Sequence, residues 1–286
     1  MFKEIAIDPA AVVASAVQFN NIIDRFGISE GRLIAAFPSS WRKLVYEAAK
    51  TNLEGKMDLN RIVERLNNLP KTVFMSQGRP GQGCNSNWVQ AAIEEHRRTP
   101  FHAVVASTQV DEDGFVQPDD ISNDHPSFFP NRQWNVKRDA ISMADCCSPL
   151  LYGSYHIKLI DYKFNASAPR WKRPFQEFLR RTKSGATIDI FREEDVQTKN
   201  YVAGVEDALK EVARIGASLR LFLIPKGTMH KRFVLTDKGG ITFDIGLDAD
   251  FGGLKTHDIV TVLQEDIRME QWEKYAGDDC LIELDI

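Results

Sequence analysis

Residues 156–246 alternate between two kinds of apolar segment, and this alternation restricts the fold more than any other feature of the sequence. Three short apolar segments are typical of buried strands: 156–164, 186–191 and 219–225. Two segments with helical periodicity lie between them, each followed by a glycine that favours a helix end: 173–183 and 201–215. The order strand, helix, strand, helix, strand predicts a sheet with parallel strands and helices packed on it.

Two more strands are expected after this cycle with no helix between them, at 230–236 and 241–246. The residues that separate them are Asp237-Lys238-Gly239-Gly240. Glycine adopts the positive φ angles that a tight hairpin requires, so this pair predicts an antiparallel connection. The C-terminal half is therefore expected to be an α/β domain with a mixed sheet and flanking helices.

The first hundred residues follow a different pattern, in which apolar residues recur mainly at helical spacing. Helices are expected after the cap signal Asp8-Pro9, near 11–26, 41–48, 59–69 and 88–98. An apolar run at 101–106 predicts a buried strand, and the polar stretch 108–135 predicts a long irregular segment. We therefore expect three parts: a mainly helical N-terminal domain at 1–100, a strand and long irregular connection at 101–147, and the α/β domain at 148–286.

Composition and charge exclude several classes of function. The 286 residues carry a formal net charge of −4, so nucleic-acid binding would need a local basic patch. The longest apolar runs, such as Leu219 to Pro225, are far shorter than the roughly 20 residues of a membrane helix, so no membrane span is expected. The four cysteines and six histidines show no ligand spacing, so we expect no metal site, no cofactor and a cytoplasmic location.

The segment from Met229 to Asp237 combines a histidine and an arginine at strand spacing. On a strand, His230, Arg232 and Val234 would share one face, because side chains alternate between the two faces. An imidazole can attack phosphorus, and a planar guanidinium can bind two phosphate oxygens. The pair therefore predicts phosphate recognition or phosphodiester cleavage. Asp237 also fits a local role, since aspartate is favoured where a glycine turn begins.

This segment resembles the motif of the phospholipase D superfamily, which reads His, any residue, Lys, four residues, Asp. His230, Arg232 and Asp237 occupy those positions, with arginine in place of lysine. The chain is most similar to the phospholipase D-like domain at the C-terminus of MIT-domain proteins, which has His-x-Arg, a glycine-containing turn and Gly-Leu-Asp. The matching residues, within a likeness that covers roughly 148–266, are His230-Lys231-Arg232, Gly239-Gly240 and Gly246-Leu247-Asp248.

The resemblance implies two different outcomes for activity. Active members use two motifs, from two halves of one chain or from a homodimer: one histidine forms a covalent phosphoenzyme and the other protonates the leaving group. This chain has one motif, and Asp244 and Ile245 stand where active members have glycine and serine. The MIT-linked domains are non-catalytic and some bind acidic membrane lipids, which implies that phosphate or partner recognition persists without catalysis.

A second His-x-Lys sequence occurs at His156-Ile157-Lys158. Its aspartate, Asp161, comes two positions too early for the motif. An isolated match of this kind is more often a structural strand than a half-site. We therefore expect a structural strand here.

Charge is distributed unevenly along the C-terminal half. Residues 167–183 contain six basic residues and one acidic residue, whereas 244–286 contain twelve acidic and three basic residues. A basic helix beside Trp171 fits contact with a nucleic-acid backbone or anionic head groups, and it also fits an ordinary solvated helix face. The candidate phosphate-binding or nucleic-acid-binding residues on it are Arg170, Lys172, Arg173, Arg180 and Arg181.

Three functions follow as hypotheses. The first is a degenerate phospholipase D-like module that recognises a phosphate-bearing ligand, above all nucleic acid, with partner proteins in a bacterial multi-component antiphage system. The second is a metal-independent phosphodiesterase or nuclease completed by homodimerisation, in which His230 is the nucleophile, Arg232 binds phosphoryl oxygens and Asp237 orients a histidine. The third is a scaffold whose N-terminal domain and 108–135 segment bind partner proteins.

Overall fold

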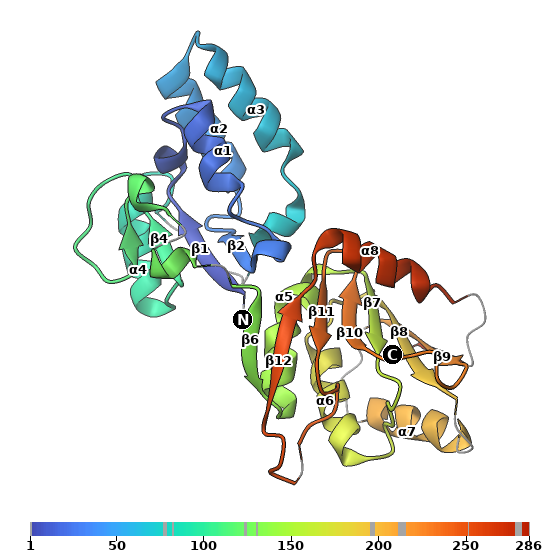
Figure 1. Cartoon of the computed structure of the whole chain (residues 1–286). Helices are drawn as coiled ribbons and strands as arrows, with labels where there is room; N and C mark the ends of the chain where they lie inside the picture. Colours follow the sequence, from blue (N-terminus) through green and yellow to red (C-terminus); the bar gives the residue numbers. More distant parts are fainter. Residues whose placement is uncertain are drawn as a thin grey trace. The chain divides into compact units, whose positions relative to one another are not determined.

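The computed structural model describes residues 2–76, 79–81, 83–122, 125–129, 131–194, 198–210, 216–250, 252–277 and 282–285. They form two compact units, Phe2–Asn131 and Arg132–Ile286, and each unit has its own sheet (Figure 1). Within these ranges, none of the helices combines the length and the apolar character that crossing a membrane requires.

The N-terminal unit is built around a parallel sheet of short strands in the order β3-β2-β1-β4-β5. The strands are β1 (Lys3–Ile7), β2 (Arg32–Ala35), β3 (Phe74–Met75), β4 (Ala103–Val105) and β5 (Phe115–Val116). The α-helices described in this unit are α1 (Ala16–Ile23), α2 (Trp41–Leu53), α3 (Met57–Asn68) and α4 (Trp88–Arg98).

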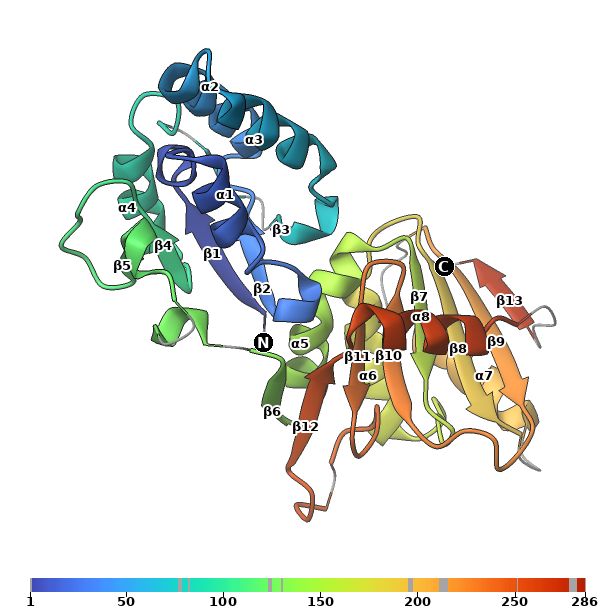
Figure 2. The same ribbon diagram turned by 45° about the horizontal axis from the view of Figure 1, so that its top comes forward.

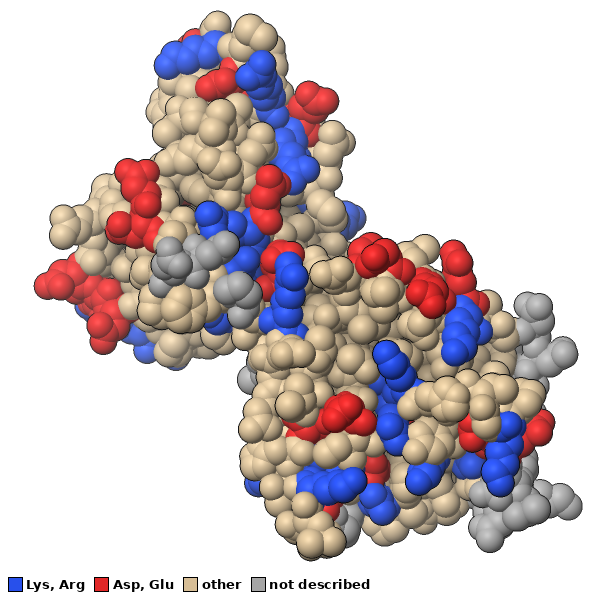
Figure 3. All heavy atoms as spheres, in the orientation of Figure 1, with Lys and Arg blue, Asp and Glu red and all other residues tan. Residues whose placement is uncertain are grey.

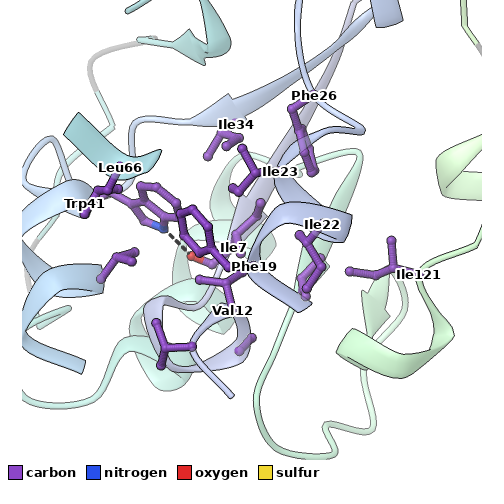
Figure 4. Close-up of a cluster of buried hydrophobic side chains, with 14 of the residues drawn as sticks. Ile7, Val12, Phe19, Ile22, Ile23, Phe26, Ile34, Trp41, Leu66 and Ile121 are labelled. Atoms are coloured by element: carbon purple, nitrogen blue, oxygen red, sulfur yellow. Dashed lines mark hydrogen bonds between the residues drawn. The ribbon is translucent and has the colours of Figure 1, made fainter. Parts of the chain in front are cut away.

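Helices cover both faces of this sheet. Trp41 of α2 donates its indole N–H to the Ile7 carbonyl of β1 at 2.6 Å, and Phe19 of α1 lies in the same buried cluster (Figure 4). Residues that alternate with Ile7, such as Ala6, belong to a second cluster with Trp88 of α4. Because successive strand residues point to opposite faces, the two clusters lie on the two sides of the sheet.

The sheet of the N-terminal unit corrects the predicted domain organisation. Helices occur near the predicted positions, but they cover strands that the helical pattern of 1–100 did not reveal. The boundary lies between Asn131 and Arg132, so residues 101–131 belong to the N-terminal unit and do not form a connection that extends to 147. Strands of two to five residues are too short for periodicity to distinguish them from other buried segments.

The C-terminal unit contains a mixed sheet in the order β13-β9-β8-β7-β10-β11-β12-β6. Its strands are β6 (Gln133–Lys137), β7 (His156–Ile160), β8 (Thr187–Glu193), β9 (Ser218–Ile224), β10 (Arg232–Thr236), β11 (Gly240–Phe243), β12 (His257–Val262) and β13 (Ile282–Asp285). Strands β7, β8 and β9 are parallel, and the other neighbouring strands pair antiparallel. The predicted mixed α/β sheet and its hairpin, here β10 and β11, are confirmed.

Helices flank this sheet as well: α5 (Ala140–Gly153), α6 (Pro169–Arg180), α7 (Thr198–Lys210) and α8 (Glu265–Lys274). Helix α8 crosses one face of the sheet (Figure 2). Tyr275, just past its end, belongs to a buried cluster with Phe191 and Phe233. Helices α5 and α6 pack against each other, and Gln176 of α6 bonds to the Ala208 carbonyl of α7.

The strand directions define one edge of this sheet as the place for a site. The carboxyl ends of β7, β8 and β9 meet there because the three strands are parallel. Strand β10 runs antiparallel to β7, with Phe233 opposite Ile160, so β10 begins at the same edge. In open α/β sheets, ligands bind outside the carboxyl ends of the parallel strands.

Candidate functional site

Arg232 is the first residue of β10 and lies at this edge. Its Nη2 donates to the Tyr162 hydroxyl at 2.6 Å, and its Nη1 donates to the Asp244 carbonyl at 3.2 Å. The guanidinium carbon lies 4.5 Å from the centre of the Tyr162 ring. Both hydrogen-bond acceptors are uncharged, and the contact with Asp244 is exposed to solvent.

No carboxylate of the described residues forms an ion pair with Arg232. Its Nε–H is buried and has no acceptor within the same residues. The nearby carboxyl of Asp161 is buried and accepts the backbone N–H groups of Lys163 and Leu247, both at 2.9 Å; burial raises the pKa of this carboxyl above its ordinary value. Arg232 therefore holds a positive charge that no ion pair described here neutralises.

His230 lies in the loop before β10, because the strand begins at Arg232 and not at residue 230 as predicted. His230 and Lys231 are exposed. The carboxylate of Glu193, at the end of β8, holds this loop by accepting the backbone N–H groups of Gly227 and Met229, both at 2.9 Å. The imidazole and the guanidinium are thus neighbours at one edge, but the strand does not fix them side by side on one face.

Asp237 lies beyond the opposite end of β10. This strand has five residues, which at about 3.3 Å per residue separates its ends by roughly 15 Å. The Asp237 carboxylate accepts the Tyr155 N–H at 3.2 Å and pairs with Lys238 at 2.9 Å. Burial opposes ionisation here, but Lys238 and neighbouring hydrogen bonds lower the pKa of Asp237. The structure therefore does not bring His230, Arg232 and Asp237 together in one chain, because the extended backbone separates them.

The second His-x-Lys sequence also lies away from Arg232. His156 is at the amino end of β7, where its Nε2 is 2.6 Å from the Asp189 carboxylate of β8. Lys158 is buried and donates to the Trp272 and Tyr275 carbonyls at the end of α8, at 3.0 and 2.9 Å. These contacts support the predicted structural strand, and His156 and His230 lie at opposite edges of the sheet.

The basic helix predicted to bind phosphate is largely paired with carboxylates inside the unit. Ion pairs in which the basic side chain is exposed or partly exposed join Arg170 to Asp248, Lys172 to Asp207, Arg180 to Glu177, and Arg181 to Asp145 and Glu177. Arg173 is exposed. The local charge count missed this pairing because Asp145, Asp207 and Asp248 come from other elements. On the face of the molecule seen in Figure 3, basic and acidic side chains intermingle.

The turn after β11 is assembled around buried charges. The Asp248 carboxylate forms an ion pair with the Arg138 guanidinium at 2.9 Å, and it also accepts a hydrogen bond from the Arg170 guanidinium. Asp258 accepts the Ile245 N–H at 3.0 Å. The sequence pointed to Gly246-Leu247-Asp248, but nothing in it identified Arg138, which lies between β6 and α5 and is 3% exposed. This turn places the Asp244 carbonyl beside Arg232.

Gly246→Ala should destabilise the C-terminal unit by about 1–3 kcal/mol, the usual cost of forcing atoms into a packed site. A Cβ at this position would lie well inside van der Waals distance of the Asp248 carboxylate and 3.4 Å from that of Asp161. Urea unfolding measures the loss. Gly252→Ala is the control, because nothing lies within 4 Å of a Cβ there; equal losses in the two variants would contradict the packing argument.

No family model and no curated protein matches this sequence. Two solved structures align with part of this chain. Polyphosphate kinase from Porphyromonas gingivalis has a TM-score of 0.35 and 11% identity over 54% of this chain and 27% of that chain. TrmBL2, an archaeal chromatin protein described with a novel mode of DNA binding, has a TM-score of 0.30 and 14% identity over 55% of each chain. The chain thus spans about a quarter and about half of these proteins. Neither likeness assigns it to a family.

Proposed function

We propose that the C-terminal unit binds a phosphate-bearing ligand, specifically a nucleic acid, at the sheet edge occupied by Arg232. This proposal rests on the hydrogen-bond partners of the Arg232 guanidinium. They are the Tyr162 hydroxyl and the Asp244 backbone carbonyl, and no described carboxylate forms an ion pair with it. A guanidinium held in this way can exchange neutral acceptors for charged phosphate oxygens, which form stronger hydrogen bonds.

Charges of both signs lie around Arg232. They favour a local contact between Arg232 and a phosphate, and they do not form the broad basic surface that would bind a nucleic acid by charge alone. Exposed cationic side chains along the same edge come from Lys163, Lys226 and Lys231. Acidic residues lie there too: Glu193, Glu194 and Asp244. Glu193 uses a carboxylate oxygen to hold the loop before β10. A ligand with a flexible, narrow backbone of phosphates can reach Arg232 between these residues.

The proposal includes a degenerate phospholipase D-like module, as the resemblance in the sequence implies. The mixed sheet and the position of His230-Lys231-Arg232 at the carboxyl edge support it. The distance from His230 to Asp237 favours recognition over catalysis in a single chain. A role with partner proteins in a bacterial antiphage assembly remains part of the proposal; mass measurement after mixing with neighbouring gene products tests it.

Replacing Arg232 with alanine should weaken binding of a fluorescein-labelled 12-nucleotide strand by about tenfold to a hundredfold, because charge-assisted hydrogen bonds contribute about 1.5–3 kcal/mol. Fluorescence anisotropy at fixed salt measures the affinity. The matched control is Arg180→Ala on α6, which removes one exposed arginine already paired with Glu177 and should change affinity less than threefold. Unchanged affinity in the Arg232 variant would contradict the proposal.

A hydrolysis assay separates recognition from catalysis. We expect no His230-dependent hydrolysis of bis-p-nitrophenyl phosphate by a monomer in EDTA, since the structure places no described acid or base within hydrogen-bond distance of this imidazole. Light scattering of the same sample gives the mass. Turnover by a dimer that disappears in His230→Ala would instead support a phosphodiesterase completed by homodimerisation.

A further inference from the structure

Two aromatic rings with cationic partners follow β7 in the chain, one shortly after the end of that strand and one in the first turn of α6. Tyr162 lies two residues past the end of β7, and its ring has the Arg232 guanidinium 4.5 Å and the Lys163 ammonium 5.3 Å from its centre. The Trp171 ring, in the first turn of α6, has the Arg170 guanidinium 4.7 Å from its centre. Both rings are partly exposed.

The turn at 246–248 connects these two aromatic groups. Asp161, the residue before Tyr162, accepts the Leu247 N–H at 2.9 Å. The next residue, Asp248, holds the Arg170 side chain that lies over Trp171. The Arg170 carbonyl in turn accepts the Ala249 N–H at 2.8 Å. One hydrogen-bonded network therefore links this turn to the residue before Tyr162 and to Arg170, the residue before Trp171.

A flat ring beside a cation is suited to a nucleobase and its phosphate together. Bases stack on aromatic rings and on guanidinium planes, and this binding tolerates any base because each has a π face. In a duplex, those faces are covered by neighbouring base pairs. Only an unpaired strand can place a base on Tyr162 while an adjacent phosphate contacts Arg232.

We propose that this edge selects single-stranded nucleic acid over duplex, with Tyr162 as the main stacking platform and Trp171 as a second one. The inference rests on the proposed function, since it specifies the ligand class of the same site. Tyr162 also positions Arg232 through its hydroxyl, so its ring and its hydroxyl have separable roles: the ring contacts a base and the hydroxyl orients the guanidinium.

Anisotropy titrations with three probes test the inference: a labelled 12-nucleotide strand, the duplex of the same sequence, and inorganic polyphosphate as a competitor. Wild type should bind the strand at least tenfold more tightly than the duplex. Tyr162→Ala should lose about tenfold for the strand, whereas Tyr162→Phe, which keeps the ring, should lose less than threefold. Tyr152→Ala, at a tyrosine 63% exposed on α5, is the control and should change nothing.

The outcomes separate this inference from the proposed function. Equal affinity for strand and duplex, or equal loss of strand and polyphosphate binding in Tyr162→Ala, would overturn single-strand selection while leaving phosphate recognition in place. Absence of binding to all three probes by folded wild type would overturn both. Thermal unfolding of each variant verifies that a loss of binding does not come from a loss of fold.

Discussion

Arg79→Ala should lower the free energy of unfolding of the N-terminal unit by about 3–5 kcal/mol, the usual cost of removing one partner from a buried ion pair. Arg79 is 4% exposed and lies between two buried carboxylates. Its Nη2 is 2.6 Å from Glu4 of β1, and its Nη1 is 2.9 Å from Glu95 of α4. Without the guanidinium, two carboxylates would remain close together in the interior. Urea unfolding followed by far-ultraviolet circular dichroism measures the change.

Arg98→Ala is the matched control for this variant. Arg98 pairs with the same Glu95, but its side chain is 58% exposed. Exposed pairs contribute about 0–1 kcal/mol, so this substitution should have a small effect. If both variants lose the same free energy, burial of the Arg79 cluster is not what stabilises the unit.

Asp189→Asn should destabilise the C-terminal unit by about 3 kcal/mol, because it removes a buried carboxylate that the partly exposed Arg220 and His156 side chains share. Asp189 is 3% exposed and lies between Lys158 and Arg220 across β7, β8 and β9. Arg220 donates to both carboxylate oxygens, at 2.7 and 2.9 Å. The control is Asp207→Asn, at a 61% exposed carboxylate that pairs with Lys172, and this substitution should change stability much less.

The same residue gives an expected dependence of stability on pH. Burial opposes ionisation of Asp189, but hydrogen bonds from His156 and Arg220 outweigh it and hold the pKa of Asp189 below its ordinary value. The unfolded chain therefore binds this proton at higher pH than the folded chain does. Asp189 stabilises the fold above the ordinary carboxyl pKa of about 4, and this contribution is lost as pH falls through the lower folded pKa.

Asp189→Asn should accordingly reduce the loss of stability between about pH 5 and pH 3 relative to wild type. Urea midpoints at a series of pH values measure the difference, with Asp207→Asn as the parallel control. An identical pH dependence in wild type and Asp189→Asn would show that this carboxylate titrates alike in the folded and unfolded chains.

Local sequence determined most of the C-terminal sheet. Apolar periodicity predicted β7, β8, β9 and the helices between them, because each element has a pattern that depends only on neighbours in the chain. The Gly239-Gly240 pair predicted the hairpin of β10 and β11 for the same reason. The His230-Lys231-Arg232 segment was also found from sequence, since its residue types alone suit phosphate.

Tertiary structure decided what those residues can do. Motif spacing grouped His230 with Asp237, but an extended strand holds them at opposite edges of the sheet. Charge counting made α6 a basic face, but Asp145, Asp207 and Asp248 pair with it from elements distant in the chain. Ion pairs and sheet edges depend on which segments meet in space. Sequence therefore determined the elements and the chemistry available, and folding alone decided that Arg232 stays without an ion pair among the described residues.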